Sequence, residues 1–438
     1  MKSQSMPAVS AKLDRQFINE EGKSVRFIVV QVHAPKLEKQ AGPRTPLNLA
    51  MVIDASGSMS GGPIEAAKTA TASVIRRLKS DDRLSIVSFA DDVQVHCDAI
   101  TQDAEGRTLA ASRVAAVSTR GSTDLAAGWL GGCECVARVM EAEPRMRNRV
   151  VLLSDGHANH GVIDPATLER HAAELRTRGI MSSTVGIGVN YSPAQLQAIA
   201  EQGGGRMHDA EQPEEIIEIL LAELEEVTMT ALENVEILLE LAPGVEVEPV
   251  GGLPCSRDTG MLRTVVGAMI SEAGRTVVFK VTTPAGAAGQ VTAVTVAAAW
   301  RWPGETQTQT QACGAVEFTF ATMKQCESQA RDNRVSLEVA RMWQMAIVRR
   351  TIALNTDGAY EAAERYAREE NKWFARYCRD LPGAAEFLEP LERLAGASSM
   401  AMHSVTSKEM MLDSYKSIRG ETDKRSKKRG SWDEHLKP

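Results

Sequence analysis

Long apolar runs are absent from this sequence of 438 residues. No stretch approaches the roughly 20 uncharged apolar residues that a membrane-spanning helix needs, and the N-terminal segment lacks the apolar core of a signal peptide. Aromatic residues make up only 4% of the chain, and the seven cysteines are an odd number, which favours reduced thiols over a disulfide framework. The net charge of −7 argues against a general nucleic-acid binder. We therefore expect a cytoplasmic protein.

Several catalytic signatures are missing as well. The pattern GxxxxGK[ST] does not occur, which excludes ATP binding through a Walker A loop. Ser154 lacks the GxSxG context of an α/β-hydrolase nucleophile. Cys133 and Cys135 are separated by a single residue, so on a helix their side chains point apart, which favours buried thiols over a redox pair.

The sequence does contain a regular alternation of strands and helices over residues 46–227. Residues 46–53, 149–153 and 180–187 are nearly continuous apolar runs, which are typical of parallel strands covered on both faces. The intervening segments, of which 63–79 is the first, have apolar residues at helical spacing. This alternation predicts an α/β domain with a doubly wound, mostly parallel sheet.

The two flanks of this region follow other patterns. Residues 24–33 are β-rich and have no helix directly after them, and residues 233–320 contain several β runs broken by Pro and Gly. This pattern predicts an antiparallel β-sandwich built mainly from 233–320. Long amphipathic helices are predicted at 328–353 and 359–378, a shorter helix at about 384–395 and another at 405–418. The predicted segments are an N-terminal segment (1–45) with one strand that joins the sandwich, the α/β domain (46–227), the β-sandwich (228–322), a helical region (323–420) and a disordered tail (421–438).

Five oxygen-bearing side chains lie where ligands of a doubly wound sheet bind, outside the carboxyl ends of its strands. Asp54, Ser56 and Ser58 follow the first buried strand, Asp155 follows the second, and Thr123 lies in a loop that opens a helix between them. Carboxylate and hydroxyl oxygens are hard ligands, which suit Mg²⁺. Zinc is a poor fit because the set contains neither Cys nor His.

These residues, in this order, resemble the metal-ion-dependent adhesion site of von Willebrand factor type A (vWA) domains, and the resemblance covers about residues 46–227. It implies that Ser56 and Ser58 bind the metal directly and that Thr123 binds it directly or through water. It implies that Asp54 and Asp155 act mainly through water and hydrogen bonds. An acidic side chain of a partner protein would fill the remaining position. Mg²⁺ is the expected ion, with Mn²⁺ or Ca²⁺ as alternatives.

The resemblance also bears on function. The phrases SDDRLSIVSF and SDGHANHG are similar to those of bacterial vWA proteins and of the vWA part of plant vWA/RING proteins, although the sequence has no RING-like cluster. We expect a non-enzymatic protein-interaction module. One alternative is a substrate-presenting adaptor of a MoxR- or chelatase-like AAA+ ATPase. A metal-assisted hydrolase is another, and it would need His157 or His160 as a general base.

Two segments near the site allow more than one interpretation. Asp124, beside Thr123, is expected to cap the following helix rather than bind metal. The closing helix of the α/β domain, predicted at 213–227, leads directly into the β-rich segment. In vWA relatives with switchable affinity the corresponding helix shifts along its axis when ligand binds. Such a shift and a rigid connection are equally compatible with this sequence.

Overall fold

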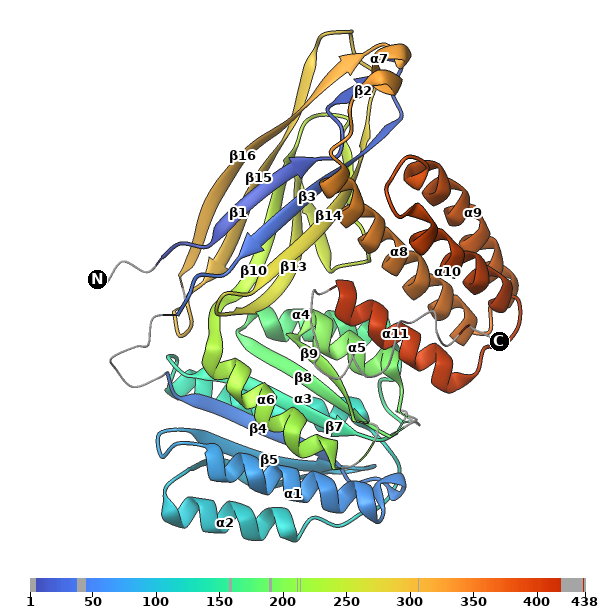
Figure 1. Cartoon of the computed structure of the whole chain (residues 1–438). Coiled ribbons are helices and arrows are strands. Elements are labelled where there is room, and N and C mark those ends of the chain that lie inside the picture. The colour runs from blue at the N-terminus through green and yellow to red at the C-terminus, as the bar shows by residue number, and fades with distance from the viewer. Residues whose placement is uncertain are drawn as a thin grey trace.

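The structure, a computed structural model, describes residues 5–37, 45–156, 160–188, 191–210, 212, 214–305, 307–418 and 436. Within these residues the chain forms an α/β part, a β-sandwich and a group of C-terminal helices that lies beside both (Figure 1). The predicted fold class is confirmed. His157 and the tail from residue 421, apart from Leu436, lie outside the described residues.

One six-stranded sheet forms the centre of the α/β part. Its strands in chain order are β4 (Leu47–Asp54), β5 (Arg83–Phe89), β6 (Val93–Thr101), β7 (Arg147–Ser154), β8 (Ile180–Ile187) and β9 (Gly204–Ala210). Their order in the sheet is β6-β5-β4-β7-β8-β9, and neighbours are parallel except β6, which pairs antiparallel with β5. The sheet is therefore mostly parallel, as predicted.

Helices cover both faces of this sheet. They are α1 (Gly62–Arg77), α2 (Ala104–Ala115), α3 (Leu125–Ala142), α4 (Pro165–Thr177), α5 (Pro193–Gln202) and α6 (Glu215–Met229). Alternate residues of β4 enter two separate cores, because successive strand residues point to opposite faces. Ile53 shares one core with Ile64 of α1, and Val52 shares the other with Trp129 of α3. All eight residues of β4 are buried as a result.

The β-sandwich packs a four-stranded sheet against a six-stranded sheet (Figure 1). In spatial order the first contains β1 (Ala8–Leu13), β3 (Ser24–His33), β14 (Gly274–Thr283) and β11 (Glu246–Pro249). In the same order the second contains β12 (Cys255–Asp258), β13 (Met261–Ile270), β10 (Thr230–Leu241), β15 (Val291–Arg301), β16 (Thr308–Ala321) and β2 (Phe17–Asn19). Ile28 and Phe279 of the first sheet share a core with Ile237 and Phe318 of the second.

The N-terminal segment contributes more to the sandwich than the sequence predicts. The predicted strand at 24–33 is confirmed as β3, which lies between β1 and β14. However, β1 and β2 also join, and they enter different sheets. The sequence does not predict these two additional strands. The residues of β1 are mostly half-buried without clear alternation, and β2 has only three residues, so neither gives a readable strand pattern.

The C-terminal helices pack on one side of the sandwich and reach the α/β part (Figure 1). They are α7 (Met323–Ser328), α8 (Asn333–Thr356), α9 (Tyr360–Cys378), α10 (Ala384–Ala397) and α11 (Ser404–Ile418). The predicted helix at 328–353 is corrected to α8, which begins where the Asp332 side chain accepts hydrogen bonds from the backbone N of Arg334 and Val335. Among the described helices, none combines the length and apolarity of a membrane span.

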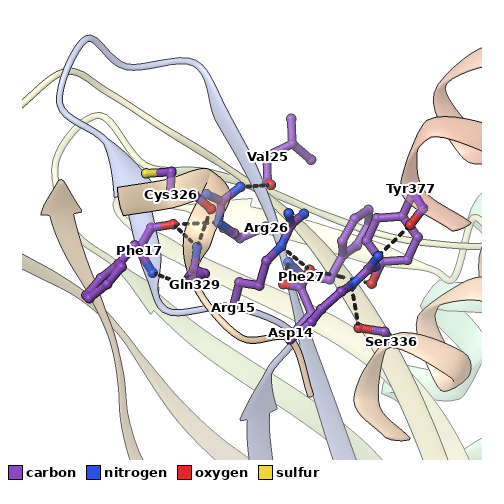
Figure 2. A network of polar contacts seen from close by, with 11 residues as sticks. Asp14, Arg15, Phe17, Val25, Arg26, Phe27, Cys326, Gln329, Ser336 and Tyr377 are labelled. Atoms are coloured by element: carbon purple, nitrogen blue, oxygen red, sulfur yellow. Dashed lines mark hydrogen bonds and ion pairs between the residues drawn. The ribbon is translucent and has the colours of Figure 1, made fainter. Parts of the chain in front are cut away.

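A buried polar network joins the N-terminal strands to these helices (Figure 2). Asp14 is 1% exposed, and its Oδ1 accepts a hydrogen bond from the backbone N of Phe27 at 2.9 Å. The backbone O of Asp14 accepts another from the N of Asp332 at 3.2 Å. Arg331 donates to the backbone O of Tyr377 at 2.6 Å, and its guanidinium lies 4.2 Å above that ring. The chain start is thereby fastened to α8 and α9.

Candidate metal centre

The predicted metal-site residues lie at the carboxyl edge of the α/β sheet. Asp54 is the last residue of β4, and Asp155 directly follows β7. The two strands are parallel neighbours, with Ile53 opposite Leu153. This register brings Asp54 and Asp155 together although about 100 residues separate them. A short 3-10 helix, η1 (Gly57–Met59), follows β4 and turns the chain back toward Asp155.

Hydroxyl and carboxylate oxygens from these two loops are in contact. The Oγ atoms of Ser56 and Ser58 are 3.0 Å apart. Ser58 Oγ also donates a hydrogen bond to Oδ1 of Asp155 at 2.7 Å. Ser56 and Asp155 are buried, whereas Ser58 is exposed. The cluster is therefore anchored in the protein and accessible from solvent through Ser58.

Asp54 lies beneath this cluster, and both of its oxygens accept hydrogen bonds. Oδ1 accepts one from the backbone N of Ser56 at 2.8 Å, and Oδ2 accepts one from the Ser154 hydroxyl at 2.5 Å. Burial raises the pKa of Asp54, although these hydrogen bonds lower it in part. Burial also raises the pKa of Asp155; the Ser58 hydroxyl lowers that pKa, and the charge of Asp54 raises it. A cation between the loops would favour both ionised carboxylates.

The loop that carries Thr123 is tied to the first loop by backbone hydrogen bonds. The N of Gly57 donates to the O of Gly121 at 3.2 Å, and the N of Arg120 donates to the O of Ala55 at 2.6 Å. Thr123 itself is only 4% exposed. These backbone bonds hold the third loop in place without using the side chains of the cluster.

Gly156 shows that Thr123 faces the same space as the serines. A Cβ atom placed on Gly156 would lie 3.5 Å from Oγ of Ser58 and 3.6 Å from Oγ1 of Thr123. The two hydroxyls therefore border one small space, which the missing side chain of Gly156 leaves open. The structure thus brings together all five residues predicted from the sequence.

The donor set fits a hard dication better than a transition metal. It consists of two carboxylates and three hydroxyls, which are the oxygen ligands that Mg²⁺ and Ca²⁺ accept. A group of three or more His, Cys, Asp or Glu side chains arranged for metal binding does not occur in the part of the chain that the structure describes. The residues of the cluster therefore fit a divalent cation that takes oxygen ligands.

The structure also assigns roles to three neighbours of the cluster. Asp124 caps α3, since its Oδ1 accepts a hydrogen bond from the backbone N of Ala127 at 2.9 Å, and the predicted capping role is confirmed. His160 is exposed, and its Nδ1 lies 3.3 Å from Oδ2 of Asp124, the residue that caps α3. Ser154, which lacks the sequence context of a nucleophile, donates a hydrogen bond to Asp54 instead. Its position at the end of β7, directly before Asp155, was the sequence feature that could have indicated this role.

The sequence profile of the von Willebrand factor type A domain matches residues 48–221. These residues form a vWA domain. The matched segment contains the whole oxygen cluster, from Asp54 to Asp155. The resemblance inferred from the motif is confirmed at the level of the domain.

Two solved structures share the fold over nearly the whole chain. A von Willebrand factor type A protein from Catenulispora acidiphila has a TM-score of 0.68 and 15% identity, and the match covers 93% of this chain and 96% of that one. The ArnB paralog VWA2 from Sulfolobus acidocaldarius has a TM-score of 0.59 and 15% identity, with 94% and 98% covered. At this identity the likeness concerns fold alone. It extends beyond the vWA domain to the sandwich and the C-terminal helices.

Relatives in sequence match less than half of this chain. The Synechocystis protein sll0103 is 30% identical over 201 residues, and the Escherichia coli protein YfbK is 27% identical over 202 residues. Inter-alpha-trypsin inhibitor heavy chain H3 of Mesocricetus auratus is 28% identical over 206 residues. The matches cover 46%, 45% and 45% of this chain and 46%, 34% and 23% of those proteins. The matched part thus spans less than half the length of each relative.

Proposed function

We propose that this protein is a non-enzymatic interaction module that binds an acidic side chain of a partner protein through Mg²⁺. The proposal depends on one observation. The Ser58 hydroxyl contacts both the Ser56 hydroxyl and the Asp155 carboxylate, and Thr123 borders the same space. Residues from three loops therefore meet at one solvent-accessible point, and all of their side chains there offer oxygen ligands.

The residues divide into those that would bind the ion and those that orient the ligands. Ser56, Ser58 and Thr123 offer neutral hydroxyl oxygens, so an ion held mainly by them keeps most of its positive charge. Asp54 has both oxygens engaged in hydrogen bonds and is suited to orient the first loop and to bind water on the metal. Asp155 orients Ser58 by accepting a hydrogen bond from its hydroxyl. The metal would supply an electrophilic position that attracts a carboxylate of the partner.

Calorimetric titration with Mg²⁺ and with Mn²⁺ tests metal binding by these loops. The wild-type protein is expected to bind, and the double variant Ser56→Ala/Ser58→Ala is expected to lose about tenfold or more in affinity, as seen for lost metal-site contacts. Ser60→Ala is the matched control. Ser60 is an exposed hydroxyl two residues further along that contacts Thr119 at 3.0 Å and not the cluster. Equal affinities in the double variant and the wild type would contradict the proposal.

Partner capture tests the second half of the proposal. The wild-type protein, used as bait in its native lysate, is expected to retain a partner in Mg²⁺ and to release it in EDTA. The same partner should be lost when its contacting Asp or Glu is changed to Asn or Gln, because a neutral amide does not replace a carboxylate on a dication. A partner that stays bound in EDTA and to the Ser56→Ala/Ser58→Ala variant would show that this protein associates by another surface.

A further inference from the structure

The last described helix, α11, lies between the vWA domain and the other C-terminal helices (Figure 1). Leu412 belongs to the core that α3, α4 and α5 form on one face of the vWA sheet. Met410 and Ile418 of the same helix belong to the core of the C-terminal helices. One helix therefore contributes buried side chains to two cores, and the positions of the two parts are linked through it.

Lys408 fastens α11 to the carboxyl edge of the vWA sheet. This lysine is only 8% exposed. Its Nζ lies 3.0 Å from Oδ1 of Asp209, near the end of β9, and donates to the backbone O of Gly188, which follows β8. The ammonium group also lies 4.1 Å above the ring of Tyr191. A buried ammonium is costly unless it is paired, and here a carboxylate, a carbonyl and an aromatic face compensate it.

Tyr191 connects Lys408 to strand β8. Its hydroxyl donates a hydrogen bond to Oδ1 of Asp209 at 2.6 Å. Its ring lies directly on Gly186, because a Cβ atom at that position would be 2.3 Å from the ring carbon Cζ. Only glycine leaves room for the ring there. The position of Tyr191 is thus tied to the backbone of β8.

The sheet register continues this chain of contacts to the metal cluster. Gly186 is the register partner of Asp209 on one side and of Ser154 on the other. Ser154 in turn donates its hydroxyl hydrogen bond to Asp54. Residues from four adjacent strands therefore form one row along the carboxyl edge of the sheet. The row begins at the candidate metal centre and ends at Lys408.

We propose that Lys408 is a positioning residue for the candidate metal centre, acting through Tyr191 and Gly186, and that docking of α11 is coupled to metal binding. The consequence for metal binding rests on the proposed function. The positioning itself does not, because it concerns the order of the loops in the protein without metal. Coupling between two sites must be reciprocal, so the metal should in turn protect α11.

Hydrogen exchange followed by mass spectrometry, on the metal-free full chain, tests the positioning. Lys408→Met keeps the length of the side chain and removes the ammonium. We expect faster exchange than in the wild type in residues 54–60 and 154–156. Since this change leaves Asp209 buried beside an apolar side chain, Lys408→Met/Asp209→Asn provides a second variant without that charge. Calorimetry with Mn²⁺ should show about a fivefold or greater loss of affinity in both, the lower end of typical coupling.

Arg349→Met is the matched control. Arg349 of α8 pairs with Glu201 of α5 at 2.9 Å, so it also joins the C-terminal helices to the vWA domain. Its polar partners among the described residues, Glu201 and the backbone O of Gly251, lie outside β8 and β9. Unchanged exchange of the metal loops in both Lys408 variants would overturn the proposal. Equally faster exchange of the metal loops in Arg349→Met would overturn it too. Any weakened contact between the C-terminal helices and the vWA domain would then have the same effect. If the wild type binds no Mn²⁺ while the Lys408 variants still loosen the loops, the proposed function fails and the positioning stands.

Discussion

The Ser154 hydroxyl donates a hydrogen bond to Oδ2 of Asp54 at 2.5 Å, and both residues are fully buried. The bond connects two neighbouring strands, β7 and β4, at the edge where the candidate metal centre lies. Because Oδ1 of Asp54 accepts from the backbone N of Ser56, the carboxylate joins β7 to the loop that carries the serines. Ser154 is therefore a positioning residue for the cluster rather than a ligand.

Ser154→Ala is expected to weaken both the fold and the metal centre. The substitution removes one hydrogen bond from a buried carboxylate, which typically lowers the free energy of unfolding by about 1–3 kcal/mol. The affinity for Mn²⁺ should also fall, because Asp54 loses the hydrogen bond that fixes its Oδ2. Urea denaturation and calorimetry measure the two effects.

Ser85→Ala is the matched control for Ser154→Ala. Ser85 is 1% exposed and accepts a hydrogen bond from the backbone N of Ala99 at 2.9 Å, but it lies on β5 away from the cluster. This variant should lose stability and keep its Mn²⁺ affinity. An unchanged affinity in Ser154→Ala as well would show that Ser154 has a purely structural role.

Gly156→Ala should separate metal binding from folding. The added methyl group would lie 3.5 Å from Ser58 Oγ and 3.6 Å from Thr123 Oγ1, which are ordinary van der Waals distances. We expect a change of less than about 1 kcal/mol in unfolding free energy, as for substitutions that neither clash nor bury polar groups. Metal affinity should nevertheless fall strongly, because the methyl group fills the space that the hydroxyls share.

Gly396→Ala on α10, where an added methyl group meets open space, controls for the general effect of this substitution. Calorimetry with Mn²⁺ and thermal unfolding distinguish the two variants. If Gly156→Ala binds Mn²⁺ as the wild type does, the space beside Gly156 is not where the ion binds.

Glu223 of α6 should make stability depend on acidic pH. Its carboxylate lies 2.7 Å from Nε2 of His208 and accepts a hydrogen bond from the Ser183 hydroxyl. Burial alone would raise the pKa of Glu223, but His208 and Ser183 lower it to about 2. Because the pKa is lower in the folded than in the unfolded protein, the ionised carboxylate stabilises the fold above about pH 4.5, and this stabilisation is lost as the pH falls toward 2.

Urea denaturation of the wild type and of Glu223→Gln at several pH values between 7 and 2.5 measures this effect. The stability difference between them should shrink by the order of 2–3 kcal/mol as the pH falls, since Gln does not titrate. Glu225→Gln, an exposed position on the same helix, should follow the wild type. A constant difference between wild type and Glu223→Gln across this range would show that Glu223 does not titrate in this window.

Asp14 should tolerate an amide better than a methyl group. Its strongest bond is from the backbone N of Phe27 to Oδ1 at 2.9 Å, whereas its contacts with Arg15 and the Tyr377 hydroxyl are long, at 3.4 and 3.5 Å (Figure 2). Burial also raises the pKa of Asp14, which shows that the charged form is disfavoured there. Asp14→Asn keeps an acceptor for Phe27, while Asp14→Ala leaves that N–H buried and unsatisfied.

We therefore expect Asp14→Ala to lower the free energy of unfolding by about 1–3 kcal/mol and Asp14→Asn by less than about 1 kcal/mol. Urea denaturation at neutral pH measures both. Equal losses in the two variants would mean that the negative charge of Asp14, and not the hydrogen bond from Phe27, stabilises the fold at this position.

The closing helix α6 should stay in place when the metal centre is engaged. Besides the contacts of Glu223, Arg147 donates to the backbone O of Val227, and Arg206 pairs with Glu226. These contacts hold the helix to the sheet just before β10 begins at Thr230. We expect residues 215–240 to exchange at the same rate in two samples, one with Mg²⁺ and a Glu-containing peptide and one with Mg²⁺ alone. Slower or faster exchange on adding the peptide would favour the helix shift instead.

The sequence by itself determined the features that depend on local pattern. Strand β8 has the predicted bounds because an apolar run is a property of consecutive residues. Asp54, Ser56 and Ser58 lie within five residues, so their proximity is a property of one loop. Thr123 and Asp155 could be added because parallel strands end at a common edge and because the order of residues resembles a known site.

The tertiary structure alone decided which distant surfaces meet. The sequence pattern of α11 predicts a helix. It does not predict that Leu412 enters the vWA core while Met410 enters the core of the C-terminal helices. Lys408 would be read as a solvated charge, since a lysine is buried only where distant partners compensate it. Its ion-pair partner Asp209 lies about 200 residues earlier in the chain, and only the packing of α11 against the sheet edge brings the two charges within 3.0 Å. Strand register, which is a long-range property, then connects that contact to the metal centre.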